Sequence, residues 1–252
     1  MASTGITGNV SLAGDTVLTM STPATAPFIS GTFTTGAHTL TLGTDLDLTN
    51  LGGLANNGHI SLGAGGTFIT GANQLKGGLT TGGNATFNIS HTASEGIEDE
   101  LVLGAVGTLT FQNTSPRIGT LDGHNVAGTF TLNSDLNAAN ITTLSNFGSS
   151  TLAVGANTLT LNKAFTVNNL TLANGGSLVT AAGSDFEATT ALTIASGASA
   201  TLNFTSDTSP TIGTLNATGG AGTITLGSDF NTANVTTLSN FGSSTLAVGA
   251  NT

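Results

Sequence analysis

Pairs of threonines separated by one apolar residue are the commonest grouping in this sequence that could act on a ligand. In an extended strand, both threonines of a pair point to one side and the apolar residue points to the other. A repeated array of such pairs would present hydroxyl and methyl groups for weak multivalent contacts. The threonines concerned are Thr32, Thr34, Thr39, Thr41, Thr108, Thr110, Thr129, Thr131, Thr158, Thr160, Thr223 and Thr225.

Carboxylates gather at residues 95–100 (EGIEDE), and carboxylate oxygens are the ligands that calcium prefers. The run lacks the glycine-centred spacing of a calcium loop, so we expect a solvated loop and no bound metal. Asp45 and Asp47 would share one side of a strand, but no basic or aromatic residue accompanies them, as a hydrolase would require. We therefore expect no catalytic site and no cofactor.

Histidines and Ser-Asp dipeptides recur without forming a recognisable site. The histidines are His38, His59, His91 and His124. A metal site or a catalytic base needs close partners, so we expect these dispersed side chains at the surface. Ser-Asp stands near a turn at residues 134–135, 184–185 and 228–229, where the carboxylate is expected to accept hydrogen bonds from backbone N–H groups.

The charge balance excludes several classes of partner. The 252 residues contain thirteen acidic and three basic side chains, which gives a formal net charge of -10. So few cations cannot neutralise a phosphate backbone, and we expect no binding to nucleic acid. No apolar run is long enough to cross a bilayer, so we also expect no membrane insertion of this segment. The chain has no cysteine and therefore no disulfide.

The sequence repeats itself. Residues 236–252 are identical to residues 142–158, and at the same offset of about 94 the tetrapeptide IGTL at residues 118–121 falls on residues 212–215. At an offset of about 119, residues 28–42 fall on residues 147–161. These matches divide the chain into a partial preceding coil or coils (1–27), a first copy with one extra coil (28–146), a second copy (147–240) and the start of a third (241–252). We expect a segment of a longer repetitive protein.

Short runs that alternate apolar and small polar residues predict strands that are buried on one side. Turns rich in Gly and Asn separate them, and residues 137–140 are the one place where a helical turn is expected. A motif of leucine, strand residues, small residues and glycine recurs, spaced by roughly one turn of a β-solenoid. Its leucines are Leu152, Leu170, Leu192, Leu215 and Leu238.

We therefore predict an all-β fold, a parallel β-solenoid with coils of roughly 18 to 25 residues that form one continuous stack. Leu and Phe would fill the interior, and Asn and Thr would pair along the outside. The alternative is a series of tandem β-sandwich domains, but such domains usually carry a core Trp or a corner Tyr, and this chain has neither. Open ends with little charge favour end-to-end self-association.

The segments NLTLANGGSLV at residues 169–179 and ALTIASGA at residues 191–198 resemble the passenger regions of bacterial autotransporter adhesins and haemagglutinin-like exoproteins. That resemblance implies an extracellular, non-enzymatic stalk or fibre, with a host or neighbouring cell surface as its partner. The Thr-x-Thr pairs resemble the surface of solenoidal ice-binding proteins, which leaves ice binding as an alternative beside a self-assembling fibre.

Overall fold

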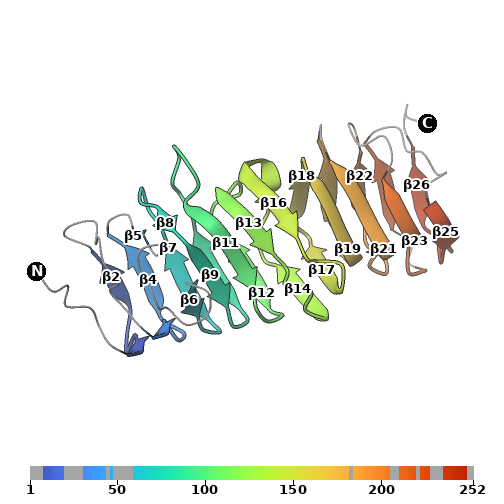
Figure 1. Ribbon diagram of the computed structural model, residues 1–252. Coiled ribbons are helices and arrows are strands. Elements are labelled where there is room, and N and C mark those ends of the chain that lie inside the picture. Colours follow the sequence, from blue (N-terminus) through green and yellow to red (C-terminus); the bar gives the residue numbers. More distant parts are fainter. Residues whose placement is uncertain are drawn as a thin grey trace, which may run out of the picture. The chain divides into compact units, whose positions relative to one another are not determined.

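The computed structural model is all-β, and its parallel strands wind into stacked coils of about 22 residues, which defines a parallel β-solenoid (Figure 1). The structure describes residues 8–19, 31–43, 46–47, 59–181, 184–204, 210–219, 222–227 and 235–248. Among them, the one helical element is a 3₁₀ turn at Ala138–Asn140, where the sequence predicted a helical turn. The predicted fold is confirmed.

The chain forms two compact units, which we describe separately. Unit 1 contains Met1–His124 and Asn140–Thr143, and unit 2 contains Asn125–Ala139 and Leu144–Thr252. Strand β16 (Ile141–Ser145) holds residues of both units. The repeat boundaries at residues 28–146, 147–240 and 241–252 stay predictions.

Each full coil of unit 1 contributes strands to three faces. The β4 face contains β2 (Thr16–Leu18), β4 (Thr39–Leu42), β7 (Gly66–Ile69), β10 (Ala85–Asn88) and β12 (Thr108–Phe111). The β6 face contains β1 (Val10–Ser11), β3 (Phe33–Thr34), β6 (His59–Leu62), β9 (Gly78–Thr81) and the later parts of β11 (Ile97–Leu103) and β13 (Ile118–Asp122). The β8 face contains β5 (Leu46–Asp47), β8 (Leu75–Lys76) and the first residues of β11 and β13.

Unit 2 is built in the same way. The β17 face contains β14 (Gly128–Leu132), β17 (Ser150–Gly155) and the later parts of β19 (Ala164–Leu172), β21 (Asp185–Ile194), β23 (Thr211–Asn216) and β25 (Val235–Ser239). The β18 face contains β15 (Leu136–Asn137), β18 (Thr158–Leu161), β20 (Ser177–Thr180), β22 (Ala200–Asn203), β24 (Thr223–Leu226) and β26 (Thr245–Ala247). The first parts of β19, β21 and β23 form a third face.

All pairings of known register in both units are parallel, so the tandem β-sandwich alternative is wrong. A sandwich needs antiparallel hairpins, whereas each coil here returns to the same face one winding later. Pairing residue on residue then places identical inward positions on top of each other.

Apolar side chains in register form the core of each unit. On the β17 face, Leu152, Leu170, Leu192 and Leu215 stack in consecutive coils and are buried, and Leu238 continues the column. This is the column that the recurring leucine motif predicted. Burial of one such leucine stabilises the fold by about 1.5–3 kcal/mol, so the stability of the solenoid grows with the number of coils.

Phenylalanine fills the corresponding column on the β4 face of unit 1. Phe68, Phe87 and Phe111 stack in register, and the rings of Phe87 and Phe111 are stacked with 5.1 Å between their centroids and 28° between their planes. Leu40 lies in the same column one coil earlier. Because β7, β10 and β12 each present a ring of the same size to the next coil, this core needs no Trp or Tyr.

The repeated IGTL tetrapeptide requires its glycine for a steric reason. In unit 2, β21 is irregular between Ala188 and Ala191, and a Cβ at Gly213 on the next coil would lie 2.6 Å from the carbonyl oxygen of Thr189. In unit 1, a Cβ at Gly119 would collide with the carbonyl oxygens of Glu98 and Asp99 in β11. A bend in one coil therefore requires a residue without a side chain in the coil that covers it.

Removal of one whole coil should be tolerated. Deletion of residues 170–191 joins Asn169 to Leu192, whose register partners are Ala191 and Leu170, so every inward column of unit 2 closes again. We expect a folded variant whose Tm falls by only a few degrees, about the contribution of one coil. Circular dichroism melting measures this change.

The matched control is deletion of residues 170–180, which removes about half a coil. This variant should lose cooperative unfolding, because strands of one face would be forced onto another. Equal stability of the two deletion variants would contradict the stacking described here.

Candidate functional site

The structure distributes the predicted threonine pairs over several faces. In unit 1, Thr34 belongs to β3 on the β6 face and Thr32 precedes it, whereas the pairs of β4 and β12 (Thr39 and Thr41; Thr108 and Thr110) lie on the β4 face. In unit 2, the pair of β14 (Thr129 and Thr131) lies on the β17 face, and the pairs of β18 and β24 (Thr158 and Thr160; Thr223 and Thr225) lie on the β18 face. The pairs therefore form no single array within either unit.

The reason is that the sequence repeat is not a whole number of coils. The hexapeptide GSSTLA occurs at residues 148–153 and again at residues 242–247, and within unit 2 the first copy forms β17 and the second forms β26, on a different face. Likewise, the column that starts at Phe130 reaches Leu215 four coils later. The residue that matches Phe130 at the repeat offset is Ile224, and it lies on β24, the strand after the one that holds Leu215.

The outward positions instead form columns of mixed small residues. On the β17 face, two neighbouring columns run in register through the strands β14, β17, β19, β21, β23 and β25. One contains Thr129, Thr151, Asn169, Ala191, Thr214 and Thr237, and the other contains Thr131, Ala153, Thr171, Thr193, Asn216 and Ser239. Neither column contains a charged or large side chain, so these columns are neutral and able to donate and accept hydrogen bonds.

A purely threonine column exists in unit 1. Thr39, Thr67, Thr86 and Thr110 lie in register on consecutive strands of the β4 face, and each is partly exposed. Two of them, Thr39 and Thr110, belong to predicted pairs, and Thr67 and Thr86 do not. Only knowledge of which coil covers which could have identified the column.

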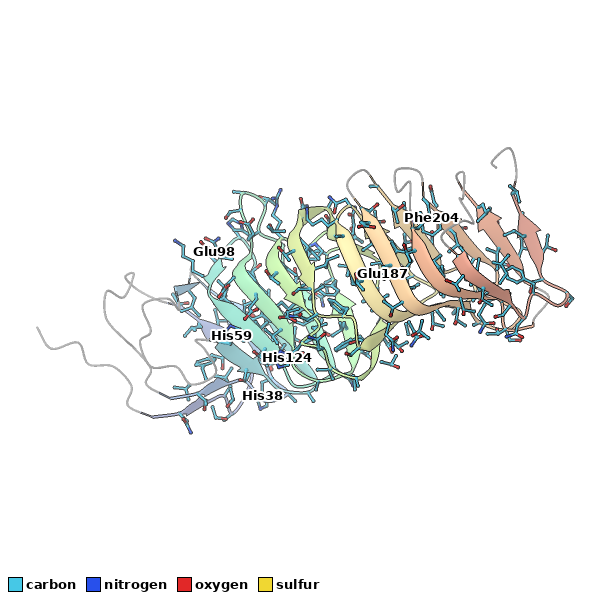
Figure 2. The ribbon with its side chains drawn as sticks, turned by 45° about the vertical axis from the view of Figure 1, so that its right-hand side comes forward. His38, His59, Glu98, His124, Glu187 and Phe204 are labelled. Carbon is cyan, nitrogen blue, oxygen red and sulfur yellow. The ribbon has the colours of Figure 1, made fainter. Side chains whose placement is uncertain are left out.

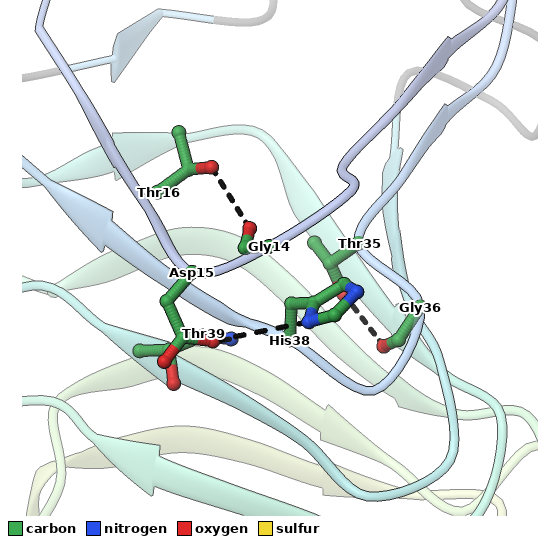
Figure 3. Close-up of polar contacts among 7 residues, drawn as sticks. All are labelled: Gly14, Asp15, Thr16, Thr35, Gly36, His38 and Thr39. Carbon is green, nitrogen blue, oxygen red and sulfur yellow. Dashed lines mark hydrogen bonds and ion pairs between the residues drawn. The ribbon is translucent and has the colours of Figure 1, made fainter.

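Hydrogen bonds between coils hold the turns of both units. The carboxylate of Asp15 accepts a 2.7 Å hydrogen bond from the backbone N–H of Thr39, one coil later, and its Oδ1 lies 4.0 Å from Nδ1 of His38 (Figure 3). Asp135 accepts the equivalent bond from Thr158. Asn84, with Thr108 as its donor, does the same without a charge. These acidic side chains therefore act as structural caps between coils.

The prediction for the Ser-Asp dipeptides holds in part. Asp135 caps a backbone N–H as expected, although the N–H belongs to the next coil. At residues 184–185 it is the serine that acts, because the hydroxyl of Ser184 donates to the carbonyl of Ala181 at 2.7 Å, while Asp185 is exposed at the start of β21. The dipeptide at residues 228–229 lies outside the described residues.

His59 is buried, so the expectation that all four histidines lie at the surface is wrong for this residue. Its side chain is 6% exposed, its Nε2 lies 3.2 Å from Oε1 of Glu100, and its Nδ1 lies 3.0 Å from Oγ1 of Thr80. The other labelled histidines, His38 and His124, come from turns of unit 1 (Figure 2). Both nitrogens of the His59 ring thus have a polar partner, and these partners offset the cost of burying the ring.

Gly78 makes room for the His59 ring. His59, Gly78 and Glu100 occupy one column on consecutive strands β6, β9 and β11, and a Cβ at Gly78 would collide with Nε2 of the ring. The imidazole lies over the glycine backbone and reaches the carboxylate two strands away. The signal in the sequence is the spacing of these residues by one coil each, which is visible only after the register of the coils is known.

Residues 97–100 of the acidic run belong to strand β11, so the expectation of a loop is wrong for them, whereas Glu95 and Gly96 precede the strand. Glu98 and Asp99 are exposed in β11, at the irregularity between Ile97 and Glu100. Glu100 contacts His59, and Oε1 of Glu95 accepts a hydrogen bond from the hydroxyl of Thr142 at 3.5 Å. The carboxylates therefore do not converge on one point.

Within the described part of the chain, no three His, Asp or Glu residues are placed so that they could hold a metal ion together. His91 contacts the backbone carbonyl of Ser94 within its own turn. Asp45 lies outside the described residues, and Asp47 is in β5. No helix among the described residues is long and apolar enough to cross a membrane.

Comparisons with protein-family models, with curated proteins and with solved structures give no match to this chain.

Substitution of Gly78 tests the His59 arrangement. We expect Gly78→Ala to lower the free energy of unfolding by about 1–3 kcal/mol, because the new methyl group displaces the ring from Glu100 and Thr80. In Gly78→Ala/His59→Ala the collision is absent, so the two single losses should not add. Chemical denaturation of the four proteins measures the coupling.

Gly82→Ala is the control, because the nearest atom to a Cβ at Gly82 is 3.6 Å away and its backbone needs no positive φ. A loss at Gly82 as large as that at Gly78, or strict additivity in the double variant, would show that the ring does not depend on Gly78.

Proposed function

We propose that this chain is a structural, non-enzymatic segment of an extracellular bacterial surface or exported protein, and that it serves as a stalk or fibre. The observation that carries the proposal is the continuous stacking of apolar columns in each unit, with neutral small residues on the outward side. Such a stack converts chain length into distance, at about 4.8 Å for each coil, without a specialised site.

The outward columns support an adhesive role in addition. The two columns of the β17 face repeat hydroxyl, methyl and amide groups once per coil, so a repetitive partner surface would meet many weak contacts at a fixed spacing. The expected partner is a host or neighbouring cell surface. A formal charge of -10 with only three basic residues gives little attraction to polyanions.

The arrangement of the threonine pairs does not support ice binding. A Thr-x-Thr plane needs the pairs to recur on one face, and in both units they lie on different faces. The β17 face mixes Thr with Asn and Ala at equivalent positions, for example Thr214, Asn169 and Ala191. We therefore propose the stalk or fibre role, with adhesive outward columns, and not ice binding.

Surface labelling tests the proposal in the organism that encodes the chain. An antibody against the purified 252-residue chain should stain intact cells, and an external protease should remove the signal. Permeabilised cells and an antibody against a cytosolic protein are the controls. Staining that requires permeabilisation, together with full resistance to the protease, would contradict an extracellular role.

A further inference from the structure

A hydroxyl, an imidazole and a carboxylate contact one another in series on the β6 face of unit 1. Oγ1 of Thr80 is 3.0 Å from Nδ1 of His59, and Nε2 of the same ring is 3.2 Å from Oε1 of Glu100. A hydroxyl that contacts an imidazole, which a carboxylate holds from its other side, is the arrangement that activates serine and threonine nucleophiles. The order of the three groups therefore gives the Thr80 hydroxyl a base.

The carboxylate determines which nitrogen of the ring carries the proton. An ionised carboxylate can only accept hydrogen bonds, so Nε2 of His59 donates to Glu100. In a neutral imidazole the other nitrogen then has a lone pair, and this nitrogen, Nδ1, faces the hydroxyl of Thr80. Thr80 is consequently the donor in this contact, and its proton points at the group that would remove it.

Register and burial hold the three groups in place. His59, Gly78 and Glu100 occupy one column on consecutive strands, and Thr80 is the next outward residue after Gly78 on β9. A side chain at Gly78 would occupy the space of the ring, and the His59 side chain is only 6% exposed. Thr80 and Glu100 are partly exposed. The base is therefore fixed in position, while the hydroxyl can be reached from outside.

The neighbours of Thr80 indicate the charge of an acyl donor that would fit. In its outward column Thr80 lies between Ser61 and Val102, and Asp122 follows Val102 on the next strand. With Glu100, two carboxylates lie close to this position, and none of the three basic residues of the sequence belongs to β6, β9 or β11. Anionic donors would be repelled, whereas the apolar part of a neutral ester could contact Val102.

We propose that Thr80 is an acyl-acceptor site, with His59 as its base and Glu100 as the residue that positions the ring. Oγ1 of Thr80 attacks the carbonyl carbon of a neutral ester, and its proton passes to Nδ1 of His59. The bond between that carbon and the leaving oxygen breaks, and the leaving group takes the proton from Nδ1. The products are an O-acyl threonine and an alcohol, and His59 returns to its neutral form.

The site is suited to a single modification and not to turnover. Strand β9 pairs with β6 on one side and with β11 on the other, so the backbone N–H groups around Thr80 serve the sheet and do not form an oxyanion hole. The second copy of the repeat, residues 147–240, contains no histidine, so the duplication has not copied the site. One acylated threonine leaves the proposed stalk intact, and this inference is independent of that role.

Incubation of the 252-residue chain with p-nitrophenyl acetate tests the proposal. Peptide mapping by mass spectrometry should find an acetyl ester on Thr80 that forms about a hundredfold faster than on Thr86, a partly exposed threonine of β10, because a positioned base gives at least this gain. Neutral hydroxylamine should remove the ester and leave the acetyl amides of Lys76 and Lys163. Ser94 is an internal control, since its Oγ is 3.5 Å from Nδ1 of His91 but no carboxylate contacts that ring among the described residues.

Variants separate the role of each group. Thr80→Ser should keep the ester, Thr80→Val should lose it, and His59→Gln should slow acetylation about a hundredfold. Glu100→Gln should also slow it, because an amide can either donate or accept, and nitrogen NMR of the imidazole should then show the proton shared between Nδ1 and Nε2.

Circular dichroism melting confirms the fold of each variant, and Glu100→Gln decides the test where His59→Gln does not fold. Acetylation of Thr80 in the parent chain that is no faster than that of Thr86 or Ser94 would overturn the proposal. An unchanged rate at Thr80 in the folded His59→Gln or Glu100→Gln chain would overturn it as well.

Discussion

Register between successive coils is the constraint on which this structure depends. Each inward side chain must lie on the equivalent side chain of the coil before it, as Leu170 lies on Leu152 and Phe87 lies on Phe68. A lone coil would expose both sides of such a residue, so no coil is stable without neighbours. Parallel pairing makes the match residue by residue, and this explains how a chain with 6% charged residues and no disulfide reaches a defined fold.

The same constraint can be met by a segment on any face of the solenoid. Every face requires apolar residues on its inward side and small residues on its outward side. The identical hexapeptide GSSTLA can therefore contribute to β17 on one face and to β26 on another. Duplication of about 94 residues therefore preserves the core while it moves the outward residues to a new face. A binding site made of particular side chains would be dispersed by such a duplication, whereas a structural stack is unaffected. This difference favours a structural role over a localised site.

The inward columns could be predicted from the sequence, and the outward arrangement could not. The spacing of Leu152, Leu170 and Leu192 indicates one coil directly, because alternation and periodicity are both visible in the chain. The face on which a threonine pair lies depends on the lengths of the turns, which vary between coils. A change in turn length moves a strand to another face, while the alternation of apolar and small polar residues stays the same. His59 was missed for a related reason, since Gly78 and Glu100 become its neighbours only through the register of β6, β9 and β11.

Engineered disulfides measure this register most directly, because the natural chain contains no cysteine. Thr193 and Asn216 are partners on adjacent strands of the β17 face, and Thr214 is the next outward residue on the second strand. The account predicts that Thr193→Cys/Asn216→Cys oxidises to an intramolecular disulfide in the folded protein, while Thr193→Cys/Thr214→Cys does not, since diagonal partners in a parallel pair lie beyond the roughly 7 Å limit between Cα atoms. Equal oxidation of both pairs, or oxidation of the diagonal pair alone, would contradict the stacking of coils in this register.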